Sequence, residues 1–162
     1  MSPVANNSKP REYSSEACLV SDLEAIIRSG TGPVFCSSVV PEFDFVSGRT
    51  DLVGLNPDST LHAFEAKLQK WKRALEQARR SRNFAHYSYV VLPQCAAQPA
   101  LKARDEFVRQ GVGLVIVVEK KARLEIVPKR KDPLMPWLTA KALTRLSDDG
   151  SKPHRSSRRS GP

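Results

Sequence analysis

The amino-acid sequence predicts an α/β fold, in which a central mixed β-sheet is flanked by helices. The apolar patterns follow one another in the order helix, three strands, helix, strand, helix and a final hairpin. The strand–helix–strand part of this order requires a crossover between parallel strands, and sheets of that kind are covered by helices. A chain of 162 residues, 40% of them apolar, is long enough to bury one such core.

The first half of this pattern supplies one helix and three strands. A helix is predicted from Ser14 or Ser15, either of which can cap it, to about Ser29, where the residues SGTGP end it. Strands are then expected in VFCSSVVPEFDFV, RTDLVGLN and LHAFEAKL, and the residues NPDS form the turn before the last of them. The apolar stripe of the helix consists of Leu19, Val20, Leu23, Ile26 and Ile27.

The second half supplies the remaining helices and strands. A helix is predicted from about Gln69 to Phe84, with Trp71, Ala74 and Ala78 on its apolar stripe. HYSYVVLP is expected to be a buried strand, and PALKARDEFVRQG a helix that ends at its glycine. VGLVIVVE and RLEIVP then form a hairpin around EKKA, and PWLTAKALTRL forms a short helix.

These elements are expected to form one domain between two polar ends. Residues 1–13 are polar and contain proline, which predicts a disordered N-terminal arm. Residues 14–128 form the domain. Residues 129–162 form a basic C-terminal extension that is expected to be largely disordered after about residue 147, because no apolar side chain follows that can anchor it.

The composition restricts the class of partner. A net charge of +9 favours an anionic partner, nucleic acid before membrane. No segment approaches the length of a membrane span, and the N-terminal residues lack the apolar centre of a secretory signal. The three cysteines are far apart and form no CxxC pair, which is typical of reduced thiols rather than of a disulfide framework or a zinc site. We therefore expect a cytoplasmic protein with no membrane partner.

An acid and a base, Glu65 and Lys67, lie within the strand-like segment LHAFEAKL. Because they are two residues apart, their side chains project from the same face of a strand. If the hairpin before them turns at NPDS, Leu55 faces Leu61, and counting outward places Asp51 opposite Glu65. Residues opposite each other in an antiparallel pair hold their side chains about 5 Å apart. Asp51, Glu65 and Lys67 are thus expected to converge.

This convergence predicts a metal site. Two carboxylates that close repel each other unless a cation lies between them. The hard oxygen atoms of Asp51 and Glu65, with the main-chain carbonyl of Ala66, suit Mg²⁺ or Mn²⁺. Such a site can hold a phosphate oxygen and lower the pKa of a water molecule, and Lys67 can orient that water or stabilise the transition state. A slip of one residue in the hairpin would break the pairing, and Asp44 is then the reserve for Asp51.

These residues resemble the motif of the PD-(D/E)xK nuclease superfamily, which has the restriction-endonuclease-like fold. The similarity consists of Asp51, then Glu65-Ala66-Lys67 on the next strand, then a basic amphipathic helix. It covers about residues 14–128, whose element order matches the α-β-β-β-α-β core of that fold, followed here by an extra helix and C-terminal strands. The resemblance implies that Asp51 and Glu65 bind the metal and that Lys67 assists the attacking water. Thr50 stands where the family often has a proline.

Two helical positions, Glu16 and Gln77, are further candidates. Glu16 falls near the middle of the buried stripe of the first helix, and the resemblance implies a role as a metal ligand, since some members place an acid there. A first-turn glutamate favoured by the helix dipole is the alternative. Gln77 lies beside the buried stripe of its helix, with Arg73 and Ser81 one turn to either side. It is similar to the glutamine of RecB-like branches, although Ser81 stands where those branches can have a tyrosine.

Basic side chains in the helix after the motif, in the last hairpin and beyond it are expected to contact nucleic acid. Contacts of this kind bind phosphate and raise the affinity without selecting a sequence. The residues selected are Lys70, Arg73, Arg80, Lys121 and Arg130. His62 is assigned a structural role, because it lies on the strand face opposite Glu65.

Together these features predict a Mg²⁺- or Mn²⁺-dependent nuclease that hydrolyses phosphodiester bonds of DNA, with RNA left open. An endonuclease of DNA repair, recombination or defence against mobile elements is favoured, because the chain has no motor domain. Two alternatives stay open. The first is a nuclease-fold protein without activity that binds nucleic acid or protein, and the second is a basic assembly factor that binds RNA or ribosomes through its tail. A homodimer or a larger complex stays open as well.

Overall fold

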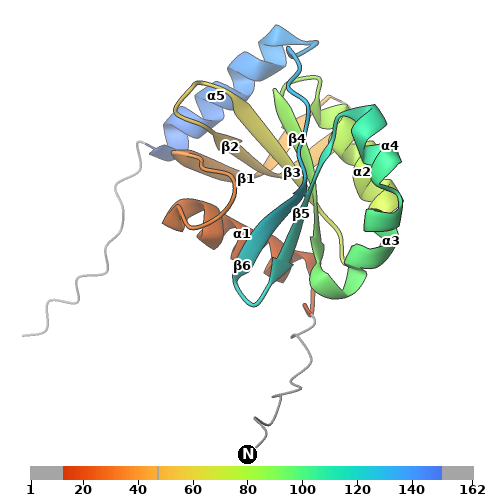
Figure 1. Cartoon of the computed structure of the whole chain (residues 1–162). Helices are drawn as coiled ribbons and strands as arrows, with labels where there is room; N and C mark the ends of the chain where they lie inside the picture. Colours follow the sequence, from red (N-terminus) through yellow and green to blue (C-terminus); the bar gives the residue numbers. More distant parts are fainter. Residues whose placement is uncertain (1–12, 47, 151–162) are drawn as a thin grey trace, which may run out of the picture.

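The computed structural model of the chain describes residues 13–46 and 48–150 (Figure 1). The residues 1–12 of the expected N-terminal arm and the residues 151–162 of the expected tail lie outside this range. In chain order the elements are α1 (Glu16–Ser29), β1 (Ser38–Phe45), β2 (Gly48–Leu55), β3 (Leu61–Ala66), α2 (Trp71–Ser81), β4 (Tyr87–Pro93), the 3₁₀ turn η1 (Gln94–Ala96), α3 (Ala97–Lys102), α4 (Arg104–Gln110), β5 (Gly113–Val118), β6 (Lys121–Ile126) and α5 (Pro136–Gly150).

The strands of the described residues form one mixed sheet in the order β1-β2-β3-β4-β5-β6. β3, β4 and β5 are parallel, whereas β1–β2, β2–β3 and β5–β6 are antiparallel pairs. Helix α2 makes the crossover from β3 to β4, and η1, α3 and α4 make the crossover from β4 to β5. The predicted α/β fold, a mixed sheet flanked by helices around an α-β-β-β-α-β core, is therefore confirmed.

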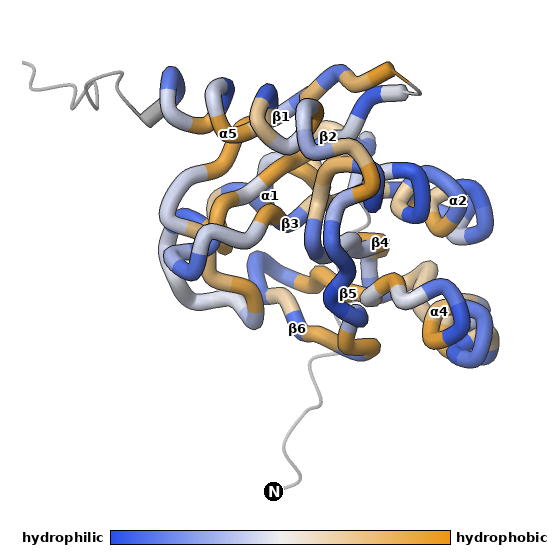
Figure 2. The backbone as a smooth tube through the Cα atoms, turned by 90° about the horizontal axis from the view of Figure 1, so that it is seen from above, coloured by the Kyte–Doolittle hydropathy of each residue, from blue (hydrophilic) through white to orange (hydrophobic). Residues whose placement is uncertain are grey.

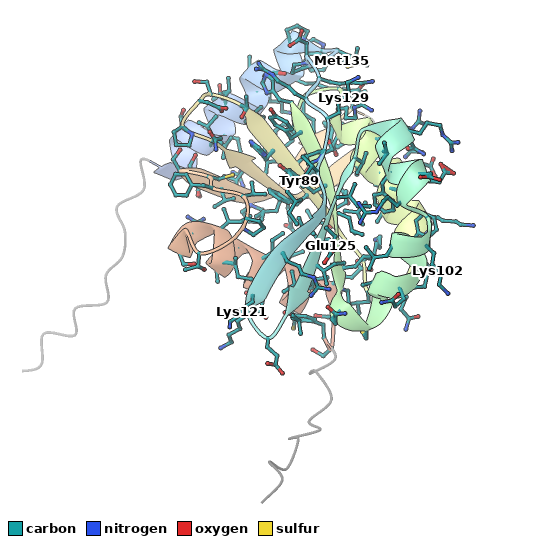
Figure 3. The ribbon with its side chains drawn as sticks, in the orientation of Figure 1. Tyr89, Lys102, Lys121, Glu125, Lys129 and Met135 are labelled. Atoms are coloured by element: carbon teal, nitrogen blue, oxygen red, sulfur yellow. The ribbon has the colours of Figure 1, made fainter. Side chains whose placement is uncertain are left out.

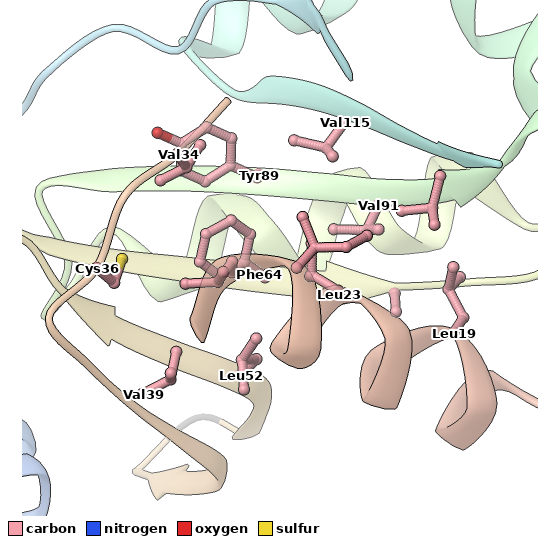
Figure 4. Packing of buried hydrophobic residues seen from close by; sticks show 14 residues of the cluster. Leu19, Leu23, Val34, Cys36, Val39, Leu52, Phe64, Tyr89, Val91 and Val115 are labelled. Carbon is pink, nitrogen blue, oxygen red and sulfur yellow. The ribbon is translucent and has the colours of Figure 1, made fainter. Parts of the chain in front are cut away.

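Helix α1 covers one face of the sheet. Ser15 caps it, because its side chain accepts a hydrogen bond from the Cys18 N–H, and Gly30 ends it in the left-handed conformation with a φ of 71°. Most of the predicted apolar stripe is buried, and Val20 is partly buried. Figure 4 shows how the helix packs against side chains of β1 to β5, which include Val39, Leu52, Phe64, Tyr89, Val91 and Val115.

The other helices cover the opposite face. Figure 1 shows α2, α3 and α4 grouped beside β4 and β5, whereas α5 lies beside β1 and β2. Ala74, Leu75 and Ala78 of α2 pack against Val90 and Leu92 of β4 in one apolar cluster. The remaining surface of α2 is mostly hydrophilic (Figure 2). No helix in the described part of the chain is long and apolar enough to span a bilayer.

Helix α5 is longer than expected. The sequence predicts a short helix in PWLTAKALTRL, which ends at Leu146, whereas the helix of the structure continues to Gly150. Leu138, Ala142 and Leu146, four residues apart, are all buried in a cluster with Phe43 of β1. Since these side chains lie on one helix face, they anchor the helix to the sheet, and the polar residues after Leu146 extend its last turn.

The helix expected in PALKARDEFVRQG is divided in two. The backbone leaves helical values at Ala103, which has φ of −98° and ψ of 24°, and α4 begins at Arg104. Asp105 and Glu106 lie in the first turn of α4. Acidic side chains are favoured at the N-terminal end of a helix, where they interact with its dipole, so this part of the sequence supports a new helix start.

Candidate active site

The hairpin of β2 and β3 has the register that the sequence predicts. Leu55 pairs with Leu61, and Leu52 pairs with Phe64. One step further along both strands, Asp51 comes opposite Glu65, and their carboxyl groups lie within hydrogen-bonding reach of each other. The expected approach of these two acids is therefore present in the structure.

The Asp51 carboxylate is held by the main chain of the neighbouring strand. The N–H of Ala66 donates a hydrogen bond to Asp51 Oδ2 at 2.8 Å. Burial raises the pKa of Asp51, and the Ala66 N–H and the nearby Lys67 act in the opposite direction. One oxygen of this carboxylate is thus fixed by the strand pairing itself.

The Glu65 carboxyl group is buried and incompletely paired. The residue is 2% exposed, and its Oε1 atom has no hydrogen-bond partner among the described residues. Burial, followed by the charge of Asp51, raises the pKa of Glu65 to about 9. The group is therefore neutral near pH 7 unless a cation binds beside it. Buried polar atoms are normally paired, so an orphaned carboxyl oxygen needs an explanation.

Lys67 follows β3 and turns toward the first helix. Its Nζ atom lies 3.3 Å from Glu16 Oε2, at the N-terminal end of α1. The Lys67 side chain is 19% exposed, and its charge acts to lower the pKa of both Asp51 and Glu65. Glu16 itself is exposed rather than buried under the helix. The structure therefore brings Glu16 to the candidate site through Lys67.

Gln77 lies on the part of α2 that faces the sheet. Its Oε1 atom is buried and has no partner in the described part of the chain. Ser81, one turn later, places its hydroxyl 3.0 Å from that of Thr50, the residue before Asp51. Ala78, the next residue, packs with Val90, the pairing partner of Glu65. Gln77 is thus on the helix that covers the two acids.

The strand alternation is irregular around Asp51. Thr50 contacts α2 and Val53 packs in the cluster on the same face of the sheet, although they are three residues apart. Glu42, on the neighbouring strand β1, has a positive φ of 54°. Non-glycine residues with a positive φ are uncommon and are found preferentially at functional sites. Neither the irregularity nor the Thr50–Ser81 contact was predicted, because the sequence shows only that both side chains are small and polar.

Asp44, the reserve for Asp51, and His62, which is assigned a structural role, both have partners outside the pair of acids. Asp44 is exposed and pairs with Arg49 at 2.7 Å, so it does not replace Asp51. His62 is buried, stacks on Tyr87 and has its Nδ1 atom 2.9 Å from the Tyr89 hydroxyl. Burial lowers the pKa of His62 to about 4. This environment agrees with a structural role.

The selected basic residues do not form one surface. Lys70 and Arg73 are exposed, and Arg80 is paired with Glu76 at 2.8 Å. Lys121 starts β6, and Figure 3 shows it at the opposite end of the molecule from Lys129, which precedes Arg130. The contacts of these side chains with nucleic acid stay a prediction.

The donor set for a cation is small. Within residues 13–46 and 48–150, no group of three or more His, Cys, Asp or Glu side chains is arranged to hold a metal ion. The close pair is Asp51 and Glu65, both oxygen donors, with the unpartnered Oε1 atom of Glu65. Oxygen donors of this kind fit Mg²⁺, which is usually held by one or two carboxylates and keeps several waters.

Comparisons with known proteins support the fold. No family model matches the chain, and no curated protein matches it. The structure of SPO1766, a protein of unknown function from Silicibacter pomeroyi, is similar over 84% of this chain and 86% of its own, with a TM-score of 0.62 and 16% identity. A repair endonuclease from Pyrococcus abyssi is similar over 57% of this chain and 45% of its own, with a TM-score of 0.38 and 18% identity. The first similarity shows a shared fold, and the second is too low to carry an argument.

Proposed function

We propose that the protein is a Mg²⁺- or Mn²⁺-dependent nuclease that hydrolyses phosphodiester bonds of DNA. The observation that carries this proposal is the buried pair of Asp51 and Glu65, in which one carboxyl oxygen lacks a partner. Two carboxyl groups so near each other are unfavourable in their ionised form without a cation. Among the described residues, no cationic side chain bonds to Glu65. The pair is therefore more easily explained as a binding site than as a structural contact.

Asp51, Glu65 and the carbonyl oxygen of Ala66 are the groups that would hold the ion. When bound, a divalent cation at such a site neutralises charge on a phosphate oxygen and lowers the pKa of a water molecule. The hydrogen bond from the Ala66 N–H keeps Asp51 in place, and Glu65 would release its proton on binding.

Lys67 would hold or orient the attacking water through its Nζ atom. Glu16, 3.3 Å away, acts as a positioning residue that limits the directions in which the ammonium group can point. The Oε1 atom of Gln77 is buried and unpartnered, and it would accept a hydrogen bond from a donor that enters the site. These roles divide the site into metal-binding groups and groups that position the water.

The chemistry of the chain favours nucleic acid as substrate. Its net charge is +9, and contacts with phosphate raise affinity independently of sequence. We infer an endonuclease acting in the cytoplasm, in DNA repair, recombination or defence against mobile elements. A homodimer would allow it to cut both strands of a duplex.

A second candidate is a nuclease-fold module that binds nucleic acid or protein without cutting. Two observations favour it. Lys67 is paired with Glu16, and the described residues contain no cluster of three metal-ligating side chains. In that case, salt-sensitive DNA binding would survive the change Glu65→Ala.

The deciding experiment is a cleavage assay with purified protein on single-stranded, duplex and branched DNA, in Mg²⁺, Mn²⁺ or EDTA. We expect cleavage that requires a divalent cation and disappears in Glu65→Gln. Glu24→Gln, a change at a partly exposed acid of α1 that pairs with Arg28, should leave the rate unchanged. If the wild type and both variants bind DNA, and none of them cleaves it in Mg²⁺ or in Mn²⁺, the second candidate is established instead.

A further inference from the structure

A cationic groove of about 500 Å³ lies where the C-terminal ends of α2 and α4 meet the segment 131–134. Positive side chains on its walls outnumber negative ones by five to one. The positive ones are Arg79, Arg80, Arg82, Arg109 and Lys131, and the negative one is Asp132. A concave surface with this balance concentrates anions.

Two of these five charges are committed to neighbouring acids. Arg80 pairs with Glu76, and Arg109 with Glu106. Arg79 and Lys131 are exposed, and their side chains make no hydrogen bond or ion pair within the described parts of the chain. These two charges are therefore free to meet a ligand.

Arg82 differs from the others because it is buried. It is 8% exposed, and its Nη1 atom donates to the main-chain oxygen of Gln110. Its Nη2 atom is buried without a partner, as is Oε1 of Gln110, which also lines the groove. Burial, and then the charge of Arg79, lower the pKa of Arg82. A buried guanidinium with an unmet donor beside a like charge is unfavourable, and an anion in the groove would offset both effects.

The groove is close to the candidate active site along the chain. Arg82 follows Ser81, whose hydroxyl lies 3.0 Å from that of Thr50, and Thr50 precedes Asp51. Neighbouring Cα atoms are ~3.8 Å apart, so Arg82 is one such step from Ser81 and Asp51 is one such step from Thr50. With the side-chain contact between Ser81 and Thr50 added, the Cα atoms of Arg82 and Asp51 are at most about 15 Å apart. Because the rise per nucleotide along the helix axis is roughly 3.4 Å and phosphates of one strand are at least this far apart, this upper limit corresponds to at most about four nucleotides.

We propose that this groove binds a backbone phosphate of a nucleic-acid strand, with Arg79, Arg82 and Lys131 as donors. The phosphate would lie a few nucleotides from the bond that is cleaved at Asp51 and Glu65. The inference rests on the proposed function in taking nucleic acid as the ligand, and it adds a contact that fixes how the strand crosses the surface.

The test is DNA binding by the full chain in EDTA, so that no cleavage takes place. The anisotropy of a fluorescein-labelled oligonucleotide is measured between about 50 and 300 mM NaCl, because the slope of log affinity against log salt counts phosphate contacts. The double variant Arg79→Ala/Lys131→Ala is compared with Lys102→Ala/Lys120→Ala, which removes the same charge from exposed residues outside the groove. Thermal unfolding confirms that both variants are folded.

We expect the groove variant to bind about ten-fold more weakly and to lose about 1.5 units of slope, and the matched control to change by less than about two-fold. The conservative change Arg82→Lys keeps the charge and loses the fork of donors, so it should weaken binding by a smaller factor. Oligonucleotides with one neutral methylphosphonate linkage locate the contact. One linkage position should weaken binding to the wild type and have no effect on the groove variant.

Equal losses in the two double variants would show a general effect of charge and would overturn the inference, as would unchanged binding by the groove variant. Failure of the proposed function gives a different result. If the wild type binds DNA through the groove in EDTA and never cleaves it in Mg²⁺ or Mn²⁺, the groove stands and the nuclease proposal falls. If it cleaves DNA and the groove variant binds normally, only the groove inference falls.

Discussion

Replacing Glu65 by glutamine is expected to remove a large part of the pH dependence of the apoprotein's stability. The carboxyl group has an ordinary pKa of 4.5 in the unfolded chain, and burial raises it to about 9 in the folded protein. The folded state therefore keeps this proton to a higher pH than the unfolded state. The stability linked to Glu65 is fully present below pH 4.5 and is lost as the pH rises toward 9.

The magnitude follows from the size of the shift. Each pKa unit corresponds to about 1.4 kcal/mol, so the interval of roughly three units between pH 4.5 and pH 7.5 gives an upper value of about 4 kcal/mol. The carboxyl groups of Asp51 and Glu65 lie within hydrogen-bonding reach, so they titrate as a pair, and part of the change in stability belongs to Asp51. We therefore expect the free energy of unfolding of the wild type to fall by an amount on the order of 2–4 kcal/mol over this pH interval, and that of Glu65→Gln not to show this fall.

The assay is urea unfolding in EDTA at several pH values from 5 to 9, for the wild type, Glu65→Gln and the surface control Glu24→Gln. Glutamine is nearly isosteric and neutral at every pH, and its amide can donate a hydrogen bond to Asp51. The free energy of unfolding of the wild type should fall relative to that of Glu65→Gln as the pH rises, whereas Glu24→Gln should follow the wild type. Parallel curves for the wild type and Glu65→Gln would refute the assignment of a buried, neutral Glu65.

Three further experiments test the site and the fold. Asp51→Asn should reduce the rate of metal-dependent cleavage by at least about a thousand-fold. Asp44→Asn, the control at an exposed aspartate, should change the rate by less than about two-fold. A loss of similar size in both variants would reject the assignment of Asp51. Thr50→Val and Ser81→Ala should each cost about 1–2 kcal/mol in urea unfolding, because each removes the contact between two buried hydroxyls, although Ser81 keeps its contact with the main-chain oxygen of Gln77 in Thr50→Val. The double variant should cost less than the sum, and strict additivity would show that the contact contributes nothing. Leu146→Ala should cost about 2–4 kcal/mol, as expected for a buried leucine, and a cost near zero would mean that α5 does not belong to the core.

The part of the site that could be predicted from the sequence is the part fixed by local geometry. The turn at NPDS and the alternation of the flanking strands set the register, and the register determines that Asp51 meets Glu65. The apolar stripe of α1 is equally local, since it depends only on the helical period. Both features involve residues less than about twenty positions apart, for which strand and helix periods are sufficient.

The features that could not be predicted depend on distant partners. Lys67 lies 51 positions from Glu16, and no period relates a residue after one strand to the first turn of an earlier helix. Arg82 belongs to a run of basic residues in which nothing distinguishes it, and its burial depends on α4. The end of α5 could not be predicted either, because its polar last turn is held by apolar residues upstream that pack on β1.

The charges around the two acids favour a divalent cation over an internal ion pair. Had Lys67 bonded to Glu65, the site would neutralise itself, and a buried carboxylate beside an ammonium group would need no further ligand. Instead Lys67 bonds to Glu16, and the two charges of that pair cancel. Lys67 still acts to lower the pKa of both acids, but burial and the charge of Asp51 outweigh it at Glu65. Full ionisation of Asp51 and Glu65 would therefore place two incompletely compensated negative charges in a buried position. One divalent ion balances those two charges, whereas a monovalent ion leaves one of them, which is why the proposed function names Mg²⁺ or Mn²⁺.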